Sequence, residues 1–289
     1  MTNSCYSHPQ YWDLAFRDET RLEADFVDAV ASRYCDFPVR RVLEPGCGGG
    51  RLVVELSSRG YDVTGFDLST PSIKYLRRRL SRRGLAANVF EGDMTCVQIE
   101  PPVDLAICPM NTFRHLVSET DARSHLESVT GSLRPGGIYL LGFHLLPTDI
   151  DPESSERWTA RHGTTQVTFS LKVLDSDRRK RIETIRFRLN VTTGGPPQRH
   201  VRYEDEFPLR MYTAAQFRRL LQSVPDLELL DVYDFWYDIN DPLDLDDKIT
   251  DTMFVLRRRR DREPTGLRHQ PARQTILSVN HDQPRCFTA

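Results

Sequence analysis

The apolar positions of the chain follow two different spacings in its first half. Leu22, Phe26, Ala29 and Val30 recur at helical spacing, which predicts an amphipathic helix over residues 20–34. Strands and further helices then alternate: short apolar runs cover residues 39–44, 61–66, 87–91, 103–108 and 138–143, and helical patterns cover residues 51–58, 70–84 and 119–133. This alternation predicts an α/β fold with a doubly wound, mostly parallel sheet.

The pattern changes after the fifth strand. Three runs rich in Val, Thr, Phe, Ile and Tyr follow one another without helices between them, at residues 166–174, 181–191 and 199–209. Their linkers have turn chemistry, so they predict a three-stranded antiparallel insert. Thr213 is suited to cap a helix over residues 213–223. Two late strands, at residues 227–236 and 252–257, bring the main sheet to seven strands.

These elements divide the chain into five segments. They are an N-terminal helical lid (residues 1–38), an α/β core (39–144), the antiparallel insert (145–212), a C-terminal completion of the core (213–260) and a disordered basic tail (261–289). From Arg257 onward there are eight Arg against three acids, so the total net charge of −2 leaves −7 on the rest of the chain. This acidic body does not favour a nucleic-acid partner. The simplest interpretation of Arg257 to Arg260 is the solvated end of a strand.

Composition narrows the class of protein further. The 289 residues suit one decorated α/β domain or two small domains. No apolar stretch approaches the ~20 residues of a transmembrane helix, and the N-terminus does not resemble a signal peptide. The six cysteines are scattered without a C-x-x-C pair. That spacing disfavours a zinc site or a disulfide framework, so we expect no bound metal and a cytoplasmic location.

A glycine-rich turn, VLEPGCGGGRL, joins the first predicted strand to a helix at residues 42–52. Glycines let a ligand approach the backbone closely, and a helix N-terminus presents free N–H groups to it. Two classes of adenosine-containing ligand use such a turn, and dinucleotides are one of these classes. Its third glycine would fall at residue 51, where this chain has Arg51. Asp67, about 20 residues beyond the turn, suits a ribose in either class.

Two further features separate the classes. Glu44 stands immediately before the turn, where its charge would repel a pyrophosphate but suit a ligand that carries an ammonium and a sulfonium. Asp93 and Met94 follow the third strand, where the carboxylate can accept from the adenine amine while Met94 packs on the ring. The combination favours a cationic adenosine compound.

In order and spacing, these motifs resemble those of class I S-adenosylmethionine-dependent methyltransferases over residues 39–144. The resemblance implies that S-adenosylmethionine is the cofactor. The residues that it implies for cofactor binding are Glu44, Gly46, Cys47, Gly48, Asp67, Leu68, Gly92, Asp93, Met94 and Pro109.

Substrate contacts are expected from three places. Tyr11 belongs to a segment that either folds over the cofactor as a lid or packs on the sheet edge. Asn111 and His115 follow the fourth strand, where Asn111 can orient a substrate and His115 can act as a base or as a structural residue. Arg210 and Tyr212 lie where the insert returns to the core, and Arg210 suits either an anionic substrate or an ion pair with an acid at residues 204–206.

The sequence therefore predicts methyl transfer from S-adenosylmethionine to a nitrogen or oxygen of a small molecule. A nucleic-acid methyltransferase that uses the basic tail and a non-catalytic protein that binds the cofactor remain alternatives. A dehydrogenase fits the motifs less well. The insert suits either a substrate lid or the interface of a homodimer, and its pattern does not distinguish the two.

Overall fold

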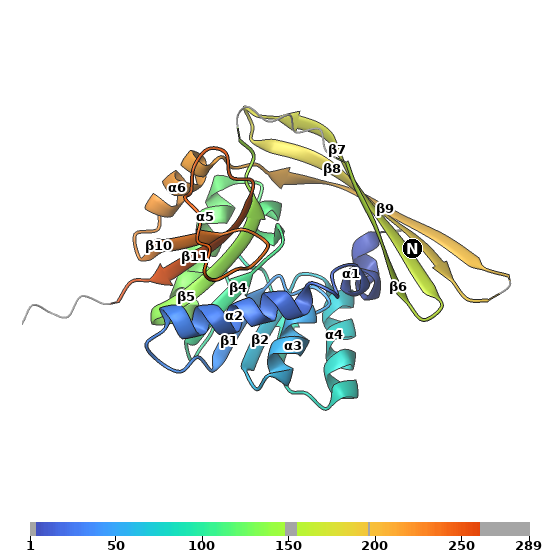
Figure 1. The fold of residues 1–289 in the computed structure, drawn as a ribbon, viewed down its shortest axis with the longest axis horizontal. Helices are drawn as coiled ribbons and strands as arrows, with labels where there is room; N and C mark the ends of the chain where they lie inside the picture. Colours follow the sequence, from blue (N-terminus) through green and yellow to red (C-terminus); the bar gives the residue numbers. More distant parts are fainter. Residues whose placement is uncertain (1–3, 148–154, 196, 261–289) are drawn as a thin grey trace, which may run out of the picture.

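A computed structural model describes residues 4–147, 155–195 and 197–260. The predicted tail at residues 261–289 lies outside the described residues. Within the described ranges, seven strands form the main sheet in the order β10-β11-β5-β4-β1-β2-β3 (Figure 1). The strands are β1 (Arg41–Pro45), β2 (Asp62–Asp67), β3 (Asn88–Glu91), β4 (Val103–Cys108), β5 (Leu133–His144), β10 (Leu227–Tyr233) and β11 (Asp251–Arg258). Strands β1 to β5 pair in parallel, and β11 is antiparallel to both of its neighbours.

Helices cover both faces of this sheet, which confirms the doubly wound α/β fold. On one face α2 (Thr20–Tyr34), α3 (Arg51–Ser58) and α4 (Thr70–Arg83) share an apolar core with the strands. On the other face α5 (Glu119–Ser132) and α6 (Ala214–Gln222) do the same. Two predicted caps are present: the Ser69 side chain accepts from the Ser72 N–H, and Thr213 forms a capping box with Gln216.

The described part of the insert has four strands, so the prediction of three was wrong. Strands β6 (Ser155–His162), β7 (Thr165–Asp177), β8 (Ile182–Thr193) and β9 (Arg199–Arg210) form one antiparallel sheet in chain order. Strand β6 escaped prediction because it is an edge strand whose side chains are mostly exposed, and only Trp158 and Ala160 pack against the apolar cluster beneath the insert.

The N-terminal residues join the insert to the α/β body. They form a 3₁₀ turn, η1 (Cys5–Ser7), and a short helix, α1 (Pro9–Ala15), that lies between the insert sheet and α4 (Figure 1). Trp12 stacks on Phe187 of the insert with ring centroids 4.2 Å apart. On the opposite side, Asp13 pairs with Arg79 of α4 at 2.7 Å. Helix α1 therefore connects the sheet of the insert to α4 of the α/β body.

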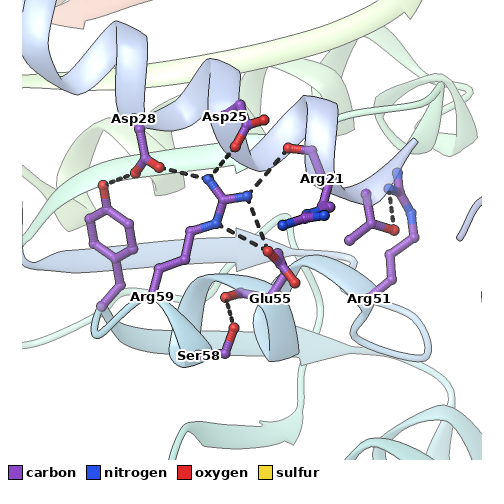
Figure 2. Close-up of polar contacts among 9 residues, drawn as sticks. Arg21, Asp25, Asp28, Arg51, Glu55, Ser58 and Arg59 are labelled. Carbon is purple, nitrogen blue, oxygen red and sulfur yellow. Dashed lines mark hydrogen bonds and ion pairs between the residues drawn. The ribbon is translucent and has the colours of Figure 1, made fainter. Parts of the chain in front are cut away.

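An ionic cluster fixes α2 against α3 (Figure 2). The guanidinium of Arg59 contacts Asp25 and Asp28 of α2 at 2.7 Å each and Glu55 of α3 at 3.0 Å. Several partly exposed charges that share one arginine form a network, which holds geometry better than an isolated surface pair. The first turns of α2 are thereby held against the C-terminal end of α3, where Arg59 follows the last helical residue.

Candidate functional site

The glycine turn lies at the carboxyl ends of β1 and β2, and its backbone requires glycine at several positions. Gly46, Gly48 and Gly50 have φ of +65°, +53° and +70°, a region that other residues rarely adopt. Apart from Gly48 and its two chain neighbours, no heavy atom of the described residues lies within 4 Å of the point where a Cβ on Gly48 would stand. The backbone on this side of the turn is therefore open to a ligand.

Asp67 ends β2 and is hydrogen-bonded to the turn. Its carboxylate accepts from the Gly48 N–H at 2.8 Å and from the Ser69 N–H at 2.7 Å. Partial burial raises the pKa of Asp67, and these two hydrogen bonds oppose the rise. Each carboxylate oxygen has a second lone pair, so Asp67 retains the capacity to accept from a pair of ribose hydroxyls. Leu68 beside it is 73% exposed.

One carboxylate oxygen of Glu44 receives no hydrogen bond from the described residues. The side chain is buried, and its Oε2 has no hydrogen-bond partner in the described structure. Burial raises the pKa of Glu44 to about 8, although the nearby charge of Arg51 lowers it. A buried carboxylate oxygen without a partner is costly, and a positively charged donor such as the ammonium of S-adenosylmethionine would satisfy it. The residues around the turn therefore fit this cofactor.

The charge of Arg51 is held by a residue that sequence reasoning missed. Glu23 of α2 is 1% exposed and makes two contacts with the guanidinium of Arg51, one of them at 2.7 Å. The Tyr237 hydroxyl also donates to Glu23, at 3.4 Å. An acid at a buried position of an amphipathic helix indicates a paired charge, but the local sequence of α2 does not identify the partner.

The segment after β3 is held in place from α5. The Met94 carbonyl oxygen lies 2.9 Å from His125 Nδ1, and His125 Nε2 lies 2.6 Å from the Tyr139 hydroxyl. Burial lowers the pKa of His125 to about 4, so the ring is neutral and structural at pH 7. Asp93 is exposed, and its Oδ1 accepts from the backbone and the side chain of Thr95. Gly92 is tied to β2, since its N–H donates to the Asp67 carbonyl oxygen at 3.2 Å.

The residues after β4 lie beside the glycine turn. A Cβ on Gly46 would stand 2.5 Å from the Thr112 side chain, so the two segments touch. Pro109 precedes Met110 and Asn111, which both have positive φ. The Asn111 Oδ1 accepts from the His144 N–H at 2.9 Å, so the amide is oriented by the backbone of β5. Its oxygen is thus committed to structure, and only its NH₂ group remains to orient a substrate.

His115 lies among aromatic rings where the N-terminal segment meets the insert. Its Nε2 is 3.3 Å from the Tyr6 hydroxyl, and its ring is 5.0 Å from that of Phe207. Desolvation by the surrounding residues lowers the pKa of His115 to about 4, with the charge of Arg114 as a smaller cause, although His115 is itself exposed at the surface. A base so far below pH 7 is a weak proton acceptor, but it is uncharged and can accept a hydrogen bond from Tyr6 or from a ligand.

The other three residues suggested for substrate lie in different surroundings. Tyr11 packs near Tyr203 of the insert, with ring centroids 6.0 Å apart. Arg210 pairs with Glu119 at 2.7 Å, rather than with an acid at residues 204–206. Tyr212 is fully buried among the core aromatics, which argues against any contact with a substrate. Local sequence could not reveal the Glu119 pair, because the two residues are 91 positions apart.

The comparisons with known proteins agree with this geometry. Residues 42–137 match the model of a methyltransferase domain family. A ubiquinone biosynthesis O-methyltransferase from Rickettsia felis is 23% identical over 121 residues, which are 42% of this chain and 48% of that protein. The chain spans about half the length of the curated relatives it matches.

Two solved structures share most of the fold. An S-adenosylmethionine-dependent methyltransferase from Clostridium acetobutylicum superposes with a TM-score of 0.69 and 16% identity, covering 87% of this chain and 97% of that one. An amino pentose methyltransferase from Micromonospora echinaspora, solved with S-adenosylmethionine bound, has a TM-score of 0.64 and 18% identity, covering 86% of this chain and 96% of that one.

Residues 42–137 match a methyltransferase domain family, and the α/β body has the fold of the class I S-adenosylmethionine-dependent methyltransferases. The predicted cofactor, S-adenosylmethionine, is the one that this class of domain uses. In the described residues no helix is long and apolar enough to span a membrane.

Proposed function

We propose that the protein transfers the methyl group of S-adenosylmethionine to a nitrogen or oxygen of a small molecule. The observation that carries the proposal is the buried, unpartnered oxygen of Glu44 beside an open glycine turn. Across the turn, Asp67 is aligned by two backbone N–H groups to accept from the ribose. Asp93 and Met94 are proposed to contact the adenine ring. Cys47 is proposed to shape the turn through its backbone rather than its thiol, because its N–H donates to the Phe66 carbonyl oxygen and its carbonyl oxygen accepts from the Gly50 N–H, both at 2.9 Å.

Two kinds of support favour a small molecule. The N-terminal segment and the insert are anchored over the end of the sheet where the turn lies, so they restrict access to it. The Micromonospora protein is named for an amino pentose and the Rickettsia protein for ubiquinone biosynthesis, and both names denote small acceptors. Neither likeness chooses between nitrogen and oxygen.

The chemistry asks the protein mainly for position and electrostatics. The cofactor supplies an activated methyl group for in-line displacement. The residues of this chain hold the acceptor about 3–3.5 Å from that methyl, which provides a large share of the rate enhancement. The segment Pro109–Asn111 borders the glycine turn and is therefore proposed to edge the transferred methyl. His115 and Tyr11 are proposed to contact the acceptor from the insert side.

Calorimetric titration with S-adenosylmethionine, S-adenosylhomocysteine and NAD tests the cofactor. We expect saturable binding of the first two, and binding of NAD alone would refute the proposal. A screen of amino sugars, catechols and a short RNA, read by mass spectrometry for S-adenosylhomocysteine and methylated product, tests the acceptor. Methylation of RNA alone would favour the nucleic-acid alternative, and tight cofactor binding without product would favour a binding protein.

A further inference from the structure

A histidine and an aspartate face each other at the carboxyl end of β5. His144 is the last residue of β5, and Asp251 is the first residue of β11. The two are direct partners in the antiparallel register, and His144 Nδ1 lies 2.7 Å from Asp251 Oδ1. Directly opposed residues of an antiparallel pair project to the same face, so the register of the sheet brings these side chains together.

This pair is coupled to the segment that borders the glycine turn. The His144 N–H donates to Asn111 Oδ1 at 2.9 Å, and the Asn111 N–H donates to the Gly142 carbonyl oxygen at 3.1 Å. Strand β5 lies next to β4, which lies next to β1, so His144 ends a strand two places from the turn. Asn111 thus makes two hydrogen bonds to the backbone of β5, one through its side-chain oxygen and one through its own N–H, and they fix the position of His144 relative to Pro109–Asn111.

The orientation of the imidazole follows from its partner. A carboxylate only accepts, so the His144 Nδ1 that faces Asp251 carries the proton, and the lone pair is on Nε2. No partner within the described residues is found for Nε2, and the His144 side chain is 41% exposed. Phe235 after β10 is an uncharged neighbour of the ring at 5.1 Å, whereas Asn111 contacts the backbone N–H of His144 and not its ring. Among the described residues, Asp251 on β11 is the ionisable group bonded to the ring.

The other histidines near the sheet do not offer this arrangement. Both ring nitrogens of His125 are hydrogen-bonded inside the core. The His115 ring lies against Tyr6, and none of the described carboxylates is bonded to it. A histidine with one nitrogen on a carboxylate and the other free is the arrangement that proton acceptors use in catalysis, because the carboxylate stabilises the charged ring.

We propose that His144 accepts the proton of the methyl acceptor, with Asp251 as its positioning residue. The inference rests on the proposed function. The acceptor N–H or O–H group attacks the methyl carbon, a nitrogen–carbon or oxygen–carbon bond forms, and the carbon–sulfur bond breaks with its electron pair remaining on sulfur. The acceptor proton moves to His144 Nε2 and then to solvent. The substrate class is an amine or hydroxyl compound that bears a proton on the atom to be methylated.

The test uses H144Q, D251N and the control variant H162Q, which removes an exposed histidine of the insert. We expect H144Q to lower kcat by about 10²–10⁴-fold while cofactor affinity stays within twofold, since general base catalysis contributes this much. The acidic limb of the kcat/KM profile should disappear in H144Q. D251N should lower kcat less than H144Q does and leave KM unchanged, because Asp251 positions the ring and does not itself accept the proton. H162Q should match the wild type.

An H144Q variant with wild-type kcat and pH profile overturns the proposed base but leaves the methyltransferase function standing. A wild type that binds the cofactor yet methylates no acceptor overturns the proposed function, and the base with it.

Discussion

Replacing Glu44 by Gln tests whether the buried carboxylate receives the ammonium of the cofactor. In the free protein, burial raises the pKa of Glu44 to about 8, so the group is protonated at pH 6. An ammonium beside it favours the ionised form, and binding at pH 6 must therefore release a proton. Below its pKa the ionised fraction of an acid rises about tenfold per pH unit. We expect cofactor affinity to rise about tenfold, or about 1.4 kcal/mol, between pH 6 and pH 7.

The rise has an upper limit set by the ligand. An α-amino group loses its proton at about pH 7.7–8.0, after which the ligand no longer carries the charge that Glu44 attracts. Affinity should therefore peak at about pH 8 and fall on either side. In E44Q the side chain is isosteric and uncharged, so the rise between pH 6 and pH 7 should vanish and binding at pH 8 should weaken.

Calorimetry in two buffers of different ionisation enthalpy measures the protons released on binding. The wild type should release about one proton at pH 6, and E44Q should release none. E100Q, at an exposed position away from the turn, provides a matched control and should behave like the wild type. Equal proton release from E44Q and wild type would refute the reasoning, because another group would then carry the linkage.

The remaining predictions concern the cofactor site and its support. Replacing Asp67 by Ala should weaken S-adenosylmethionine binding by about 1–3 kcal/mol in the same titration, and an unchanged affinity would remove Asp67 from the site. Replacing Arg51 by Met leaves Glu23 buried without its cation and should lower the free energy of unfolding in urea by about 3–5 kcal/mol. The double variant with E23Q should recover part of this loss, and an R51M variant of wild-type stability would contradict the pairing. The pKa of Glu44 is about 8 in the folded state and ordinarily 4.5, so between these pH values the folded state binds a proton that the unfolded state has lost. The Tm without cofactor should therefore fall as pH rises across that window, and it should fall less in E44Q. Y212F should keep wild-type kcat/KM, and a loss of 100-fold or more would return Tyr212 to the substrate site.

Local patterns were sufficient for the elements that carry strong periodicity or caps. The helix at residues 20–34 and the strand at 103–108 have their predicted bounds, because an amphipathic stripe and a fully buried run are unambiguous. Helix α1 was not predicted, since seven residues are too few to show a period. Strand β6 was not predicted either, because its exposed edge carries no alternation of apolar residues.

Site residues divide along the same line. The glycine turn, Asp67 and Asp93 belong to short motifs with fixed spacing, so the sequence alone nominates them. The pairs of Arg51 with Glu23 and of His144 with Asp251 join residues 28 and 107 positions apart. Such pairs depend on which helix face and which strand register meet, and neither is encoded locally. The suggested ion pair of Arg210 with an acid at residues 204–206 was wrong for the same reason.

The electrostatics of the glycine turn depend on how one arginine is shared. Arg51 lies between two buried acids, and its guanidinium is bonded to Glu23 rather than to Glu44. If Arg51 were bonded to Glu44, the oxygen at the turn would be satisfied and a cationic ligand would meet a neutral pair. Because Glu23 holds the guanidinium, the field of Arg51 lowers the cost of ionising Glu44 without occupying its Oε2. In the proposed cofactor site Glu23 therefore leaves the Glu44 acceptor available, although it lies on a different helix and has no place in the motif.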